Sequence, residues 1–288
     1  MRTTLSDRAR STFLKLPEPM RRAILHARGR YAPWEDGFDF TPPRPAPGEI
    51  SGPPEFVGIG AQKAGTTWWF GLVASHPGVA HRDDIHKERH FFNRFAARSF
   101  GSEECARYHA WFPRPVGMVT GEWTPDYLHL GWVPPLLAEA APRARLLVLL
   151  RDPVERFRSG LAHHRGHWGA LTAEAYADAL VRGFYAQALE EWTRHFPREQ
   201  ILILQYERCV RDPLGELQRT YNFLDLPPFI PDGVAERVNE SRAAQLTLPE
   251  DARRRLCELY APDVLALSAS TSEIDTRLWP NFASLIRA

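Results

Sequence analysis

The stretch FVGIGAQKAGTTWWFGL, from Phe56 to Leu72, decides the fold of this chain. Its first residues form a short apolar run, typical of a buried strand, and this run enters a glycine-rich loop that contains Lys63. A helix is predicted from Gly65 to Ser75, directly after the loop. Backbone N–H groups of such a loop and of the first helical turn attract anions, and the helix dipole adds to the attraction. The pattern predicts a cradle for a phosphate or related oxyanion, in which Lys63, Thr66 and Thr67 supply further donors.

Apolar runs alternate with helical patterns along the rest of the chain. Strands are predicted at 117–123, 144–150 and 200–207, and helices at 132–141, 151–165, 173–194, 212–226 and 249–267. Buried strands that are each followed by a helix predict an α/β fold of three layers, P-loop-like, with a central parallel sheet and helices on both faces. Ligands bind such sheets beyond the carboxyl ends of the strands, so three segments are expected at one crevice: Gly60–Thr67, Arg151–Ser159 and Gln205–Glu207.

Composition limits the classes of function. The 288 residues carry a net charge of +1, which excludes the global basic field that nucleic-acid binding favours. Seven prolines in residues 31–54 indicate a linker, so we expect an N-terminal extension and Pro-rich linker at 1–54 and one domain at 55–288. Residues 5–30 have the pattern of a basic amphipathic helix, which would dock on the domain or on a membrane surface. No apolar run is long enough to predict a transmembrane helix, and oligomeric state cannot be read from the chain.

The three cysteines, Cys105, Cys209 and Cys257, are odd in number and widely spaced. This pattern argues against a disulfide framework or a zinc site, so we expect no required metal and a reducing, cytoplasmic location. Arginine outnumbers lysine 33 to 3, which is typical of a GC-rich genome and predicts a bacterial protein.

The loop GAQKAGTTWW resembles the 5′-phosphosulfate-binding loop of sulfotransferases that use 3′-phosphoadenosine 5′-phosphosulfate (PAPS). The segment LLVLLRDPVERFRSG places Arg151 at a strand end and Ser159 eight residues later, which is the spacing of the family's 3′-phosphate site. An arginine there offers a bidentate fork to a phosphate. The loop VNESRAAQL, 238–246, resembles the segment that closes over the nucleotide. The resemblance covers roughly residues 55 to 280 and implies PAPS as the donor, bound by Gln62, Lys63, Ala64, Gly65, Thr66, Thr67, Trp68, Arg151, Ser159, Tyr206 and Arg242.

On the acceptor side, IHKERHFFNRF at 85–95 resembles the heparan sulfate O- and N-sulfotransferase branch, in which a glutamate shortly before a Phe-Phe pair is the catalytic base. The resemblance implies Glu88 as the base that takes a proton from the acceptor, with Lys63 and His90 as further catalytic residues. From local sequence alone, Glu88 in an exposed ion pair with Lys87 or Arg89 is the competing interpretation. Three histidines remain alternative bases: His81, His86 and His90.

The segment GEWTPDYL, 121–128, resembles the family's E-K-T-P-x-Y segment that lines the acceptor cleft, with Trp123 in place of the lysine. Two roles for Trp123 stay open, namely stacking on an acceptor ring and packing in the core. The histidine cluster HHRGHW, 163–168, is expected to face the acceptor rather than to bind a metal. Acceptor contacts are therefore expected from Lys87, Trp123, Thr124 and His163.

These features predict an enzyme of the EC 2.8.2 type. It would transfer a sulfuryl group in line from PAPS to a hydroxyl or amine of a small-molecule, glycolipid or carbohydrate acceptor. One alternative is a P-loop kinase or NTPase, which needs a carboxylate for Mg²⁺; the candidate, Asp152, fits a helix cap better. The other is a non-catalytic protein with a PAPS-binding fold, which would place Glu88 far from the cradle.

Overall fold

The computed structural model of the protein describes residues 16–17, 20, 24, 42–82, 86–168, 172–234 and 246–285, without the side chains of 165–168. Contacts divide the chain into two units, Met1–Thr41 with Arg94–Ser99 and Pro42–Asn93 with Phe100–Ala288. The sheet and the candidate site belong to the second unit. Most of the predicted amphipathic helix at 5–30 lies outside the described residues, as does Arg242. The predicted boundary at residue 54 stays a prediction.

A four-stranded parallel sheet forms the centre of this unit. Its strands are β2 (Phe56–Gly60), β4 (Gly121–Trp123), β5 (Arg145–Leu150) and β6 (Ile201–Gln205), in the spatial order β4-β2-β5-β6. All neighbours run parallel, and every strand residue is buried except Arg145 at the start of β5. Parallel sheets are covered on both faces, which explains why the strands are continuous apolar runs. The predicted α/β class is confirmed.

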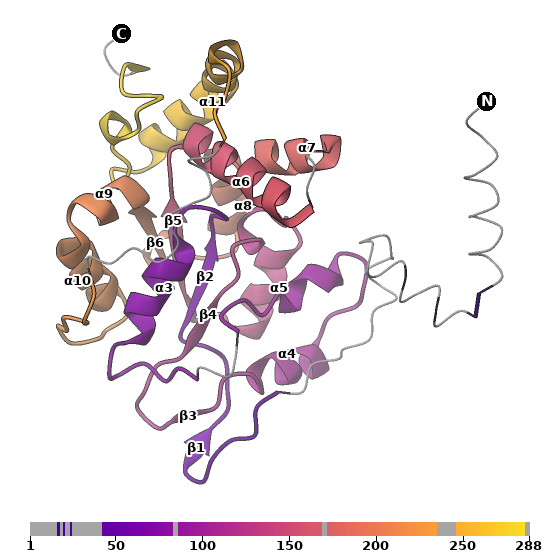
Figure 1. Cartoon of the computed structure of the whole chain (residues 1–288). Helices are drawn as coiled ribbons and strands as arrows, with labels where there is room; N and C mark the ends of the chain where they lie inside the picture. The colour runs from indigo at the N-terminus through magenta and orange to yellow at the C-terminus, as the bar shows by residue number, and fades with distance from the viewer. Residues whose placement is uncertain are drawn as a thin grey trace. The chain divides into compact units, whose positions relative to one another are not determined.

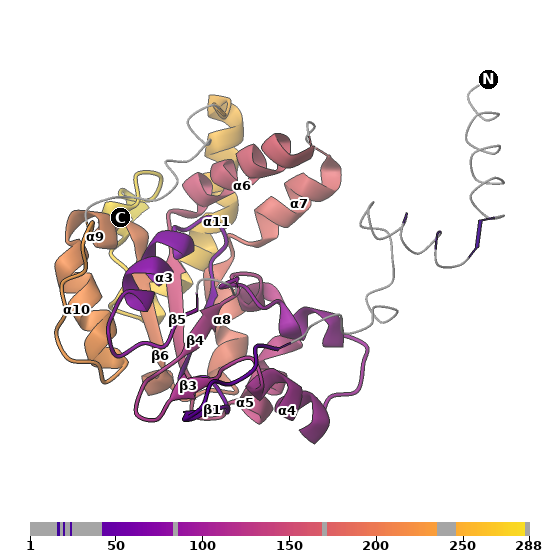
Figure 2. The ribbon, with the colours of Figure 1, turned by 60° about the horizontal axis from the view of Figure 1, so that its bottom comes forward.

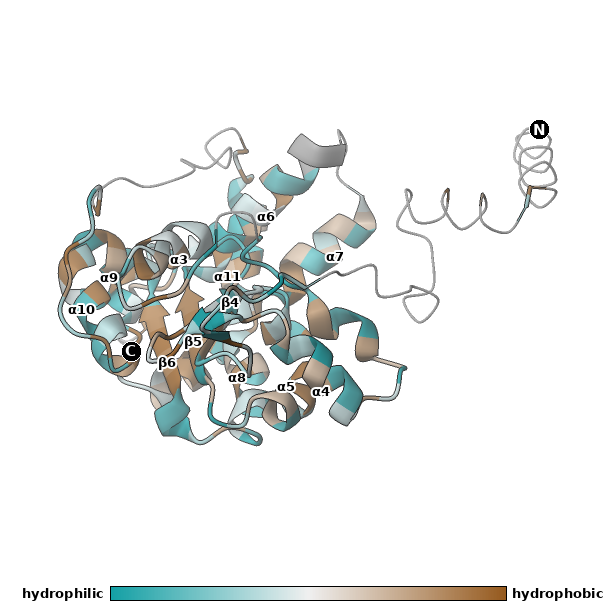
Figure 3. Cartoon of the chain, turned by 90° about the horizontal axis from the view of Figure 1, so that it is seen from below, coloured by the Kyte–Doolittle hydropathy of each residue, from teal (hydrophilic) through white to brown (hydrophobic). Residues whose placement is uncertain are grey.

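Helices follow the strands directly, as expected. The turns into α3 (Thr66–Ala74), α6 (Pro153–Trp168) and α9 (Tyr206–Arg211) lie at the upper ends of the strands in Figure 1. Figure 3 shows α3 and α8 (Tyr185–Thr193) on opposite sides of the strands, so the three-layer arrangement is also confirmed. The other helices are α4 (Ser102–His109), α5 (Val133–Ala140), α7 (Ala173–Val181), α10 (Pro213–Phe223) and α11 (Glu250–Ser270).

Short elements complete the unit. Strands β1 (Glu49–Ile50) and β3 (Arg114–Pro115) form a separate antiparallel pair. The 3₁₀ helices are η2 (Phe91–Phe95), η3 (Tyr127–His129), η4 (Arg198–Gln200) and η6 (Thr276–Leu278). Helices α6, α7 and α11 lie together in the upper part of Figures 1 and 2. Among the helices of the described residues, none is both long and apolar enough to cross a membrane.

Three predicted elements differ from the structure. The single helix expected at 173–194 is two helices, α7 and α8, which are separated at Gly183. A Cβ at Gly183 would lie 2.6 Å from the ring of Tyr260, so α11 packs closely against the chain where the helix breaks. The strand predicted at 117–123 is reduced to β4, and the strand at 200–207 ends at Gln205 because Tyr206 begins α9.

Both predicted Asp-Pro helix starts are confirmed. The Oδ1 atom of Asp152 accepts hydrogen bonds from the N–H groups of Val154 at 2.9 Å and Glu155 at 3.2 Å, at the start of α6. Asp212 accepts from the N–H of Gly215 at 3.0 Å, at the start of α10. A side-chain oxygen at this position satisfies N–H groups that have no partner within the helix.

Trp123 joins β4 to β2 through a close contact. Its side chain is fully buried, and a Cβ at Gly58 would lie 2.0 Å from the indole ring. The indole Nε1 donates a hydrogen bond to the carbonyl of Gly60 at 3.1 Å. The structure therefore resolves the open question about Trp123 in favour of core packing, and it explains why β2 needs a glycine at position 58.

Replacement of Gly58 by alanine is expected to destabilise the fold by about 2 kcal/mol or more, because the new methyl group overlaps a fully buried indole that has no space to move. Urea unfolding followed by far-UV circular dichroism measures the change. Gly71→Ala is the matched control, since Gly71 lies in α3 with nothing within 4 Å of an added Cβ. An alanine there should stabilise by about 0.5–1 kcal/mol. Equal midpoints for the two variants would contradict the packing argument.

Candidate active site

The loop between β2 and α3 has the backbone geometry of an anion cradle. Lys63 has a φ of 67° and Gly65 a φ of 95°, so two residues of the short loop are left-handed. Loops of this kind turn successive N–H groups toward one point, and such concavities bind anions. No side chain caps the N-terminus of α3, so its first-turn N–H groups face the loop without a competing side-chain acceptor. Of the predicted loop residues, Ala64 and Thr66 are buried, Thr67 is exposed, and Gln62 and Lys63 are intermediate.

Arg151 and Tyr206 reach this loop from the ends of β5 and β6. The Nη1 atom of Arg151 donates to the carbonyl of Lys63 at 3.4 Å, and its guanidinium carbon lies 4.9 Å from the centre of the Tyr206 ring. Tyr206 also contacts the loop, because a Cβ at Gly65 would lie 2.9 Å from its ring. Ser159 lies further along α6 and is 3% exposed. The structure thus brings predicted residues from three strand ends together.

Trp68 carries a buried donor that has no protein partner in the described residues. Its side chain is 4% exposed and packs edge-on near Tyr206, at 6.4 Å between ring centres, and against Trp69 at 5.1 Å. The indole Nε1 is buried and makes no hydrogen bond to the described part of the chain. Buried donors are nearly always paired in folded proteins, so this N–H is available to an acceptor that the described part of the chain does not supply.

Glu88 is held between two cationic side chains. Its Oε1 atom lies 2.6 Å from Nζ of Lys87, and its Oε2 atom lies 3.1 Å from Nε2 of His90. Burial by itself would raise the pKa of Glu88, but hydrogen bonds from His90 and Lys87 outweigh burial and lower this pKa to about 2. The carboxylate is therefore ionised at neutral pH. Local pairing with Lys87, the competing interpretation from sequence, is present together with the contact to His90.

His90 lies between two carboxylates. Its Nδ1 atom is 3.3 Å from Oδ2 of Asp126, and its Nε2 atom faces Glu88. Burial lowers the pKa of His90, but hydrogen bonds with Asp126 and Glu88 outweigh burial and raise it to about 9. The backbone of His90 is left-handed, with a φ of 49°, and its N–H donates to Oγ1 of Thr124 at 3.2 Å. His90 is thus a cation at neutral pH and acts as a donor.

The row of charges continues beyond Asp126, and sequence reasoning did not find it. Oδ1 of Asp126 lies 2.7 Å from Nη1 of Arg182, and Nε of Arg182 lies 2.9 Å from Asp178. His164 of α6 then lies 3.5 Å from Asp178. Asp126 belongs to the segment 121–128 that the sequence singled out, but Arg182 lies 56 residues further along the chain. No local pattern indicates that pair.

The segment that carries Glu88 is bonded to β4. The N–H of Trp123 donates to the carbonyl of Lys87 at 2.9 Å, and Nζ of Lys87 lies 3.3 Å from the carbonyl of Trp123. Because β4 pairs with β2, and because neighbouring strands lie about 4.8 Å apart, the Glu88 segment is attached one strand away from the strand that leads into the cradle. Trp123 connects the two through its indole contact with Gly60.

Two of the four predicted acceptor contacts are wrong, because the side chains concerned are buried. Trp123 and Thr124 are both 0% exposed, so neither side chain presents a surface to an acceptor. Oγ1 of Thr124 accepts from the N–H of Arg89 at 2.9 Å and donates to Oε2 of the buried Glu122 at 2.6 Å. These bonds position the backbone beside Glu88. Lys87 and His163 are of intermediate exposure.

The remaining candidates lie at the edge of this arrangement or outside it. His86 is exposed, and its Nδ1 atom accepts from the N–H of Glu88 at 3.2 Å. His81 is exposed and packs edge-on against Phe70, with ring centres 5.4 Å apart. Within the described ranges, no three His, Cys, Asp or Glu side chains form a group that could hold a metal ion.

The sequence matches a family of known proteins. The family model described as "Sulfotransferase domain" matches residues 53–245. The heparan sulfate glucosamine 3-O-sulfotransferase 3B1 of Mus musculus is 32% identical over 195 residues, which cover 62% of this chain and 48% of that protein. The bifunctional heparan sulfate N-deacetylase/N-sulfotransferase 3 of Homo sapiens is 28% identical over 200 residues, which cover 61% and 22%. The chain thus spans less than half the length of these two relatives.

Among solved structures, a sulfotransferase from Alicyclobacillus acidocaldarius resembles the fold. It superposes with a TM-score of 0.63 at 22% identity, and the match covers 78% of this chain and 98% of that one. This likeness concerns the arrangement of strands and helices.

The ion pairs of His90 are expected to make stability depend on pH. An unfolded histidine has a pKa of about 6.5, whereas the pKa of His90 in the fold is raised to about 9. A raised folded-state pKa contributes stability that is fully present below about pH 6.5 and is lost as the pH rises through about 9. The difference in melting temperature between wild type and His90→Gln should therefore shrink over this window.

Asp126→Asn is the companion variant, because it removes one of the two carboxylates that face His90. In the Asp126→Asn background, the pH range over which the stability contribution of His90 is lost should move to lower pH. A wild-type advantage over His90→Gln that stays constant from about pH 6 to 9.5 would show that His90 is not held as a cation.

Proposed function

The chain belongs to the sulfotransferase domain family, and from this premise we propose that it transfers a sulfuryl group from PAPS to a hydroxyl or amine of a small-molecule, glycolipid or carbohydrate acceptor. The observation that carries the proposal is the meeting of the Lys63 loop, Arg151 and Tyr206 at adjacent strand ends. Glu88 is attached to the next strand, which supports a catalytic protein over one that only binds.

The residues at the strand ends fit the chemistry of this donor. The uncapped start of α3 and Lys63 suit the 5′-phosphosulfate, since both offer donors to a compact anion. Arg151 suits the 3′-phosphate, and the role of Ser159, whose side chain is almost fully buried, stays a prediction from the sequence. The indole N–H of Trp68, which has no partner among the described residues, lies beside Tyr206 and suits an acceptor atom on the nucleotide. When bound, the donor supplies the sulfuryl group, and the chain supplies position and charge.

Catalysis in this proposal rests on charge placement. Lys63 and the loop N–H groups offset negative charge on the phosphate oxygens that remain with the nucleotide. Glu88 takes the proton of the acceptor as its oxygen or nitrogen attacks sulfur in line. Each oxygen of Glu88 accepts one hydrogen bond, from Lys87 or from His90, and keeps a further lone pair for the proton of the acceptor. Loss of either bond would raise the pKa of Glu88, because it removes one of the contributions that oppose burial.

The alternatives are less well supported. His90 is protonated at neutral pH, so it suits charge stabilisation better than proton removal. For the kinase alternative, both carboxylate oxygens of Asp152 already accept hydrogen bonds, either at the start of α6 or from Asn281. Independence from metal, a cytoplasmic location and a bacterial source stay predictions from the sequence.

A saccharide hydroxyl is the acceptor to test first. The named relatives include a heparan sulfate glucosamine 3-O-sulfotransferase and a heparan sulfate N-sulfotransferase. Burial leaves the indole of Trp123 unavailable for stacking on an acceptor ring, so this residue does not distinguish a saccharide from other acceptors.

Binding of 3′-phosphoadenosine 5′-phosphate, measured by titration calorimetry without metal, tests the donor site. Wild type should bind, and Lys63→Ala and Arg151→Ala should each weaken binding about tenfold or more, as expected when a charged donor to phosphate is lost. Arg145→Ala is the matched control, because Arg145 begins the same strand that Arg151 follows and pairs with Asp225. Binding of ATP only with Mg²⁺ would support the kinase alternative instead.

Turnover tests the base. With a saccharide acceptor and PAPS, Glu88→Gln should retain nucleotide affinity and lose at least about a hundredfold in kcat, the usual contribution of a general base. Wild-type turnover by Glu88→Gln would rule out Glu88. Tight nucleotide binding with no transfer to any acceptor in a broad screen would favour the non-catalytic alternative.

A further inference from the structure

The backbone around Arg151 is held from two sides, by the side chains of Tyr185 and Glu207. The hydroxyl of Tyr185 donates to the carbonyl of Arg151 at 2.9 Å. On the other side, the N–H of Asp152 donates to Oε1 of Glu207 at 3.0 Å. Tyr185 is fully buried, and Glu207 follows directly after Tyr206, the ring on which Arg151 stacks. The peptide bond that joins Arg151 to Asp152 is therefore fixed at both its carbonyl and its N–H.

The C-terminal segment completes this framework. Nε1 of Trp279 donates to Oε2 of Glu207 at 2.9 Å, and Trp279 is fully buried. The backbone N–H of Asn281 donates to Asp152 at 3.0 Å, and its side-chain amide donates to both oxygens of the same carboxylate at 3.1 Å. Asn281 therefore contacts Asp152 near the end of β5, although the two residues lie 129 positions apart in the chain.

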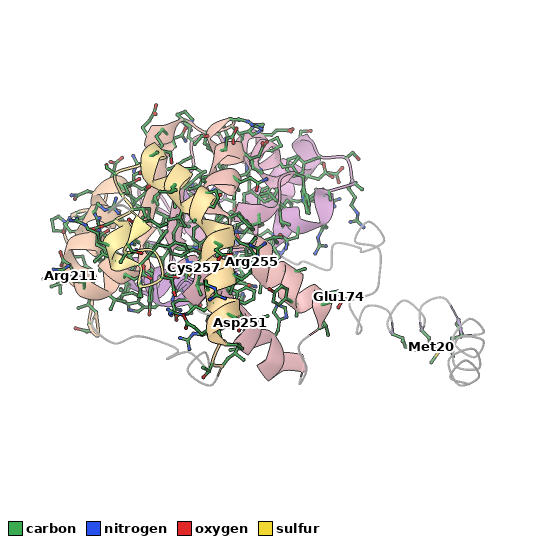
Figure 4. All side chains as sticks on the ribbon, turned by 90° about the horizontal axis from the view of Figure 1, so that it is seen from above. Met20, Glu174, Arg211, Asp251, Arg255 and Cys257 are labelled. Atoms are coloured by element: carbon green, nitrogen blue, oxygen red, sulfur yellow. The ribbon has the colours of Figure 1, made fainter. Side chains whose placement is uncertain are left out.

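The same segment is anchored to β6. The side-chain amide of Gln205, which is fully buried, donates to the carbonyl of Asp275 at 2.9 Å and accepts from its N–H at 2.9 Å. This paired contact resembles the bonding of one more strand. Helix α11 leads into the segment, and Figure 4, seen from above, shows this helix, which carries the labelled Asp251, Arg255 and Cys257, crossing the molecule.

The hydrogen bonds of this framework indicate that Asp152 and Glu207 hold the backbone in position. Burial raises the pKa of Asp152 and raises that of Glu207 to about 7, so two carboxylates lie side by side in an unfavourable environment. Within the described residues, the hydrogen bonds to both come from neutral donors, namely backbone N–H groups, an amide and an indole. The two carboxylates therefore orient the backbone beside Arg151 through hydrogen bonds, without a bond to its guanidinium group.

We propose that Glu207, Trp279 and Asn281 are positioning residues that act through Asp152 to direct the guanidinium group of Arg151 at the 3′-phosphate of the nucleotide. The inference rests on the proposed function, in which Arg151 binds that phosphate. It assigns to the C-terminal segment a part in nucleotide recognition, although the segment lies beyond residues 53–245 that match the family model.

Glu207→Gln is the first test, because glutamine keeps the shape but turns a second donor toward Asp152 or Trp279. The affinity for 3′-phosphoadenosine 5′-phosphate should fall about fivefold or more, since one hydrogen bond of the framework is lost. The affinity for adenosine 5′-monophosphate, which lacks the 3′-phosphate, should not change. In an Arg151→Ala background, Glu207→Gln should cause no further loss, because the two residues act as one unit.

Glu216→Gln is the matched control. Glu216 is also buried, in α10, and its carboxylate bonds Arg219 at 2.9 Å. This change should lower the melting temperature without altering the ratio of the two nucleotide affinities. Asn281→Ala provides a second route if Glu207→Gln does not fold, because Asn281 is partly exposed and its backbone N–H keeps its bond to Asp152. Its effect should have the same direction and a smaller size.

The outcomes separate the inference from the function on which it rests. If wild type does not bind 3′-phosphoadenosine 5′-phosphate, the proposed function fails and the inference falls with it. If wild type prefers this nucleotide to adenosine 5′-monophosphate and both variants keep the same preference, the inference alone is overturned. Equal weakening of both nucleotides would also overturn it, because that result indicates general loosening of the fold.

Discussion

The contact of Trp123 with β2 is the interaction on which the site depends. Its indole fills the space that a side chain at position 58 would need, and its N–H bonds the carbonyl of Gly60, the last residue of β2 before the loop. Its own backbone is bonded to Lys87, next to Glu88. One fully buried residue therefore connects the anion cradle to the proposed base. Interiors are packed too densely for such a contact to shift without cost.

The charges of the Glu88–His90 pair and of Arg151 are held in different ways. Glu88 is held as an anion by cations on both oxygens, and His90 is held as a cation by carboxylates on both nitrogens. At Arg151, by contrast, the nearby carboxylates are engaged by neutral donors. In the proposed mechanism, Glu88 and His90 thus balance each other's charge where the proton moves, whereas the charge of Arg151 is available to the nucleotide.

Much of the fold could be predicted because its determinants are local. The apolar runs of β2, β5 and β6, the loop with Lys63 and the caps at Asp152 and Asp212 are each complete within a few residues. The failures have tertiary causes. Gly183 disfavours a helix locally, but nothing near it in the sequence indicates that Tyr260 approaches at this position. The sequence around Trp123 is the same whether its side chain faces a ligand or the core.

By itself, the sequence determined which chemical groups follow each strand, and in a parallel sheet this places them at one edge. The loop and Arg151 could therefore be named before their geometry was known, whereas Glu88 was named from the resemblance of residues 85–95 to a known family. Only the tertiary structure decided what each group is bonded to. Arg182 meets Asp126 across 56 positions, and Trp279 meets Glu207 across 72. Such pairs depend on how distant segments pack against the sheet, and the apolar pattern within one segment does not predict that packing.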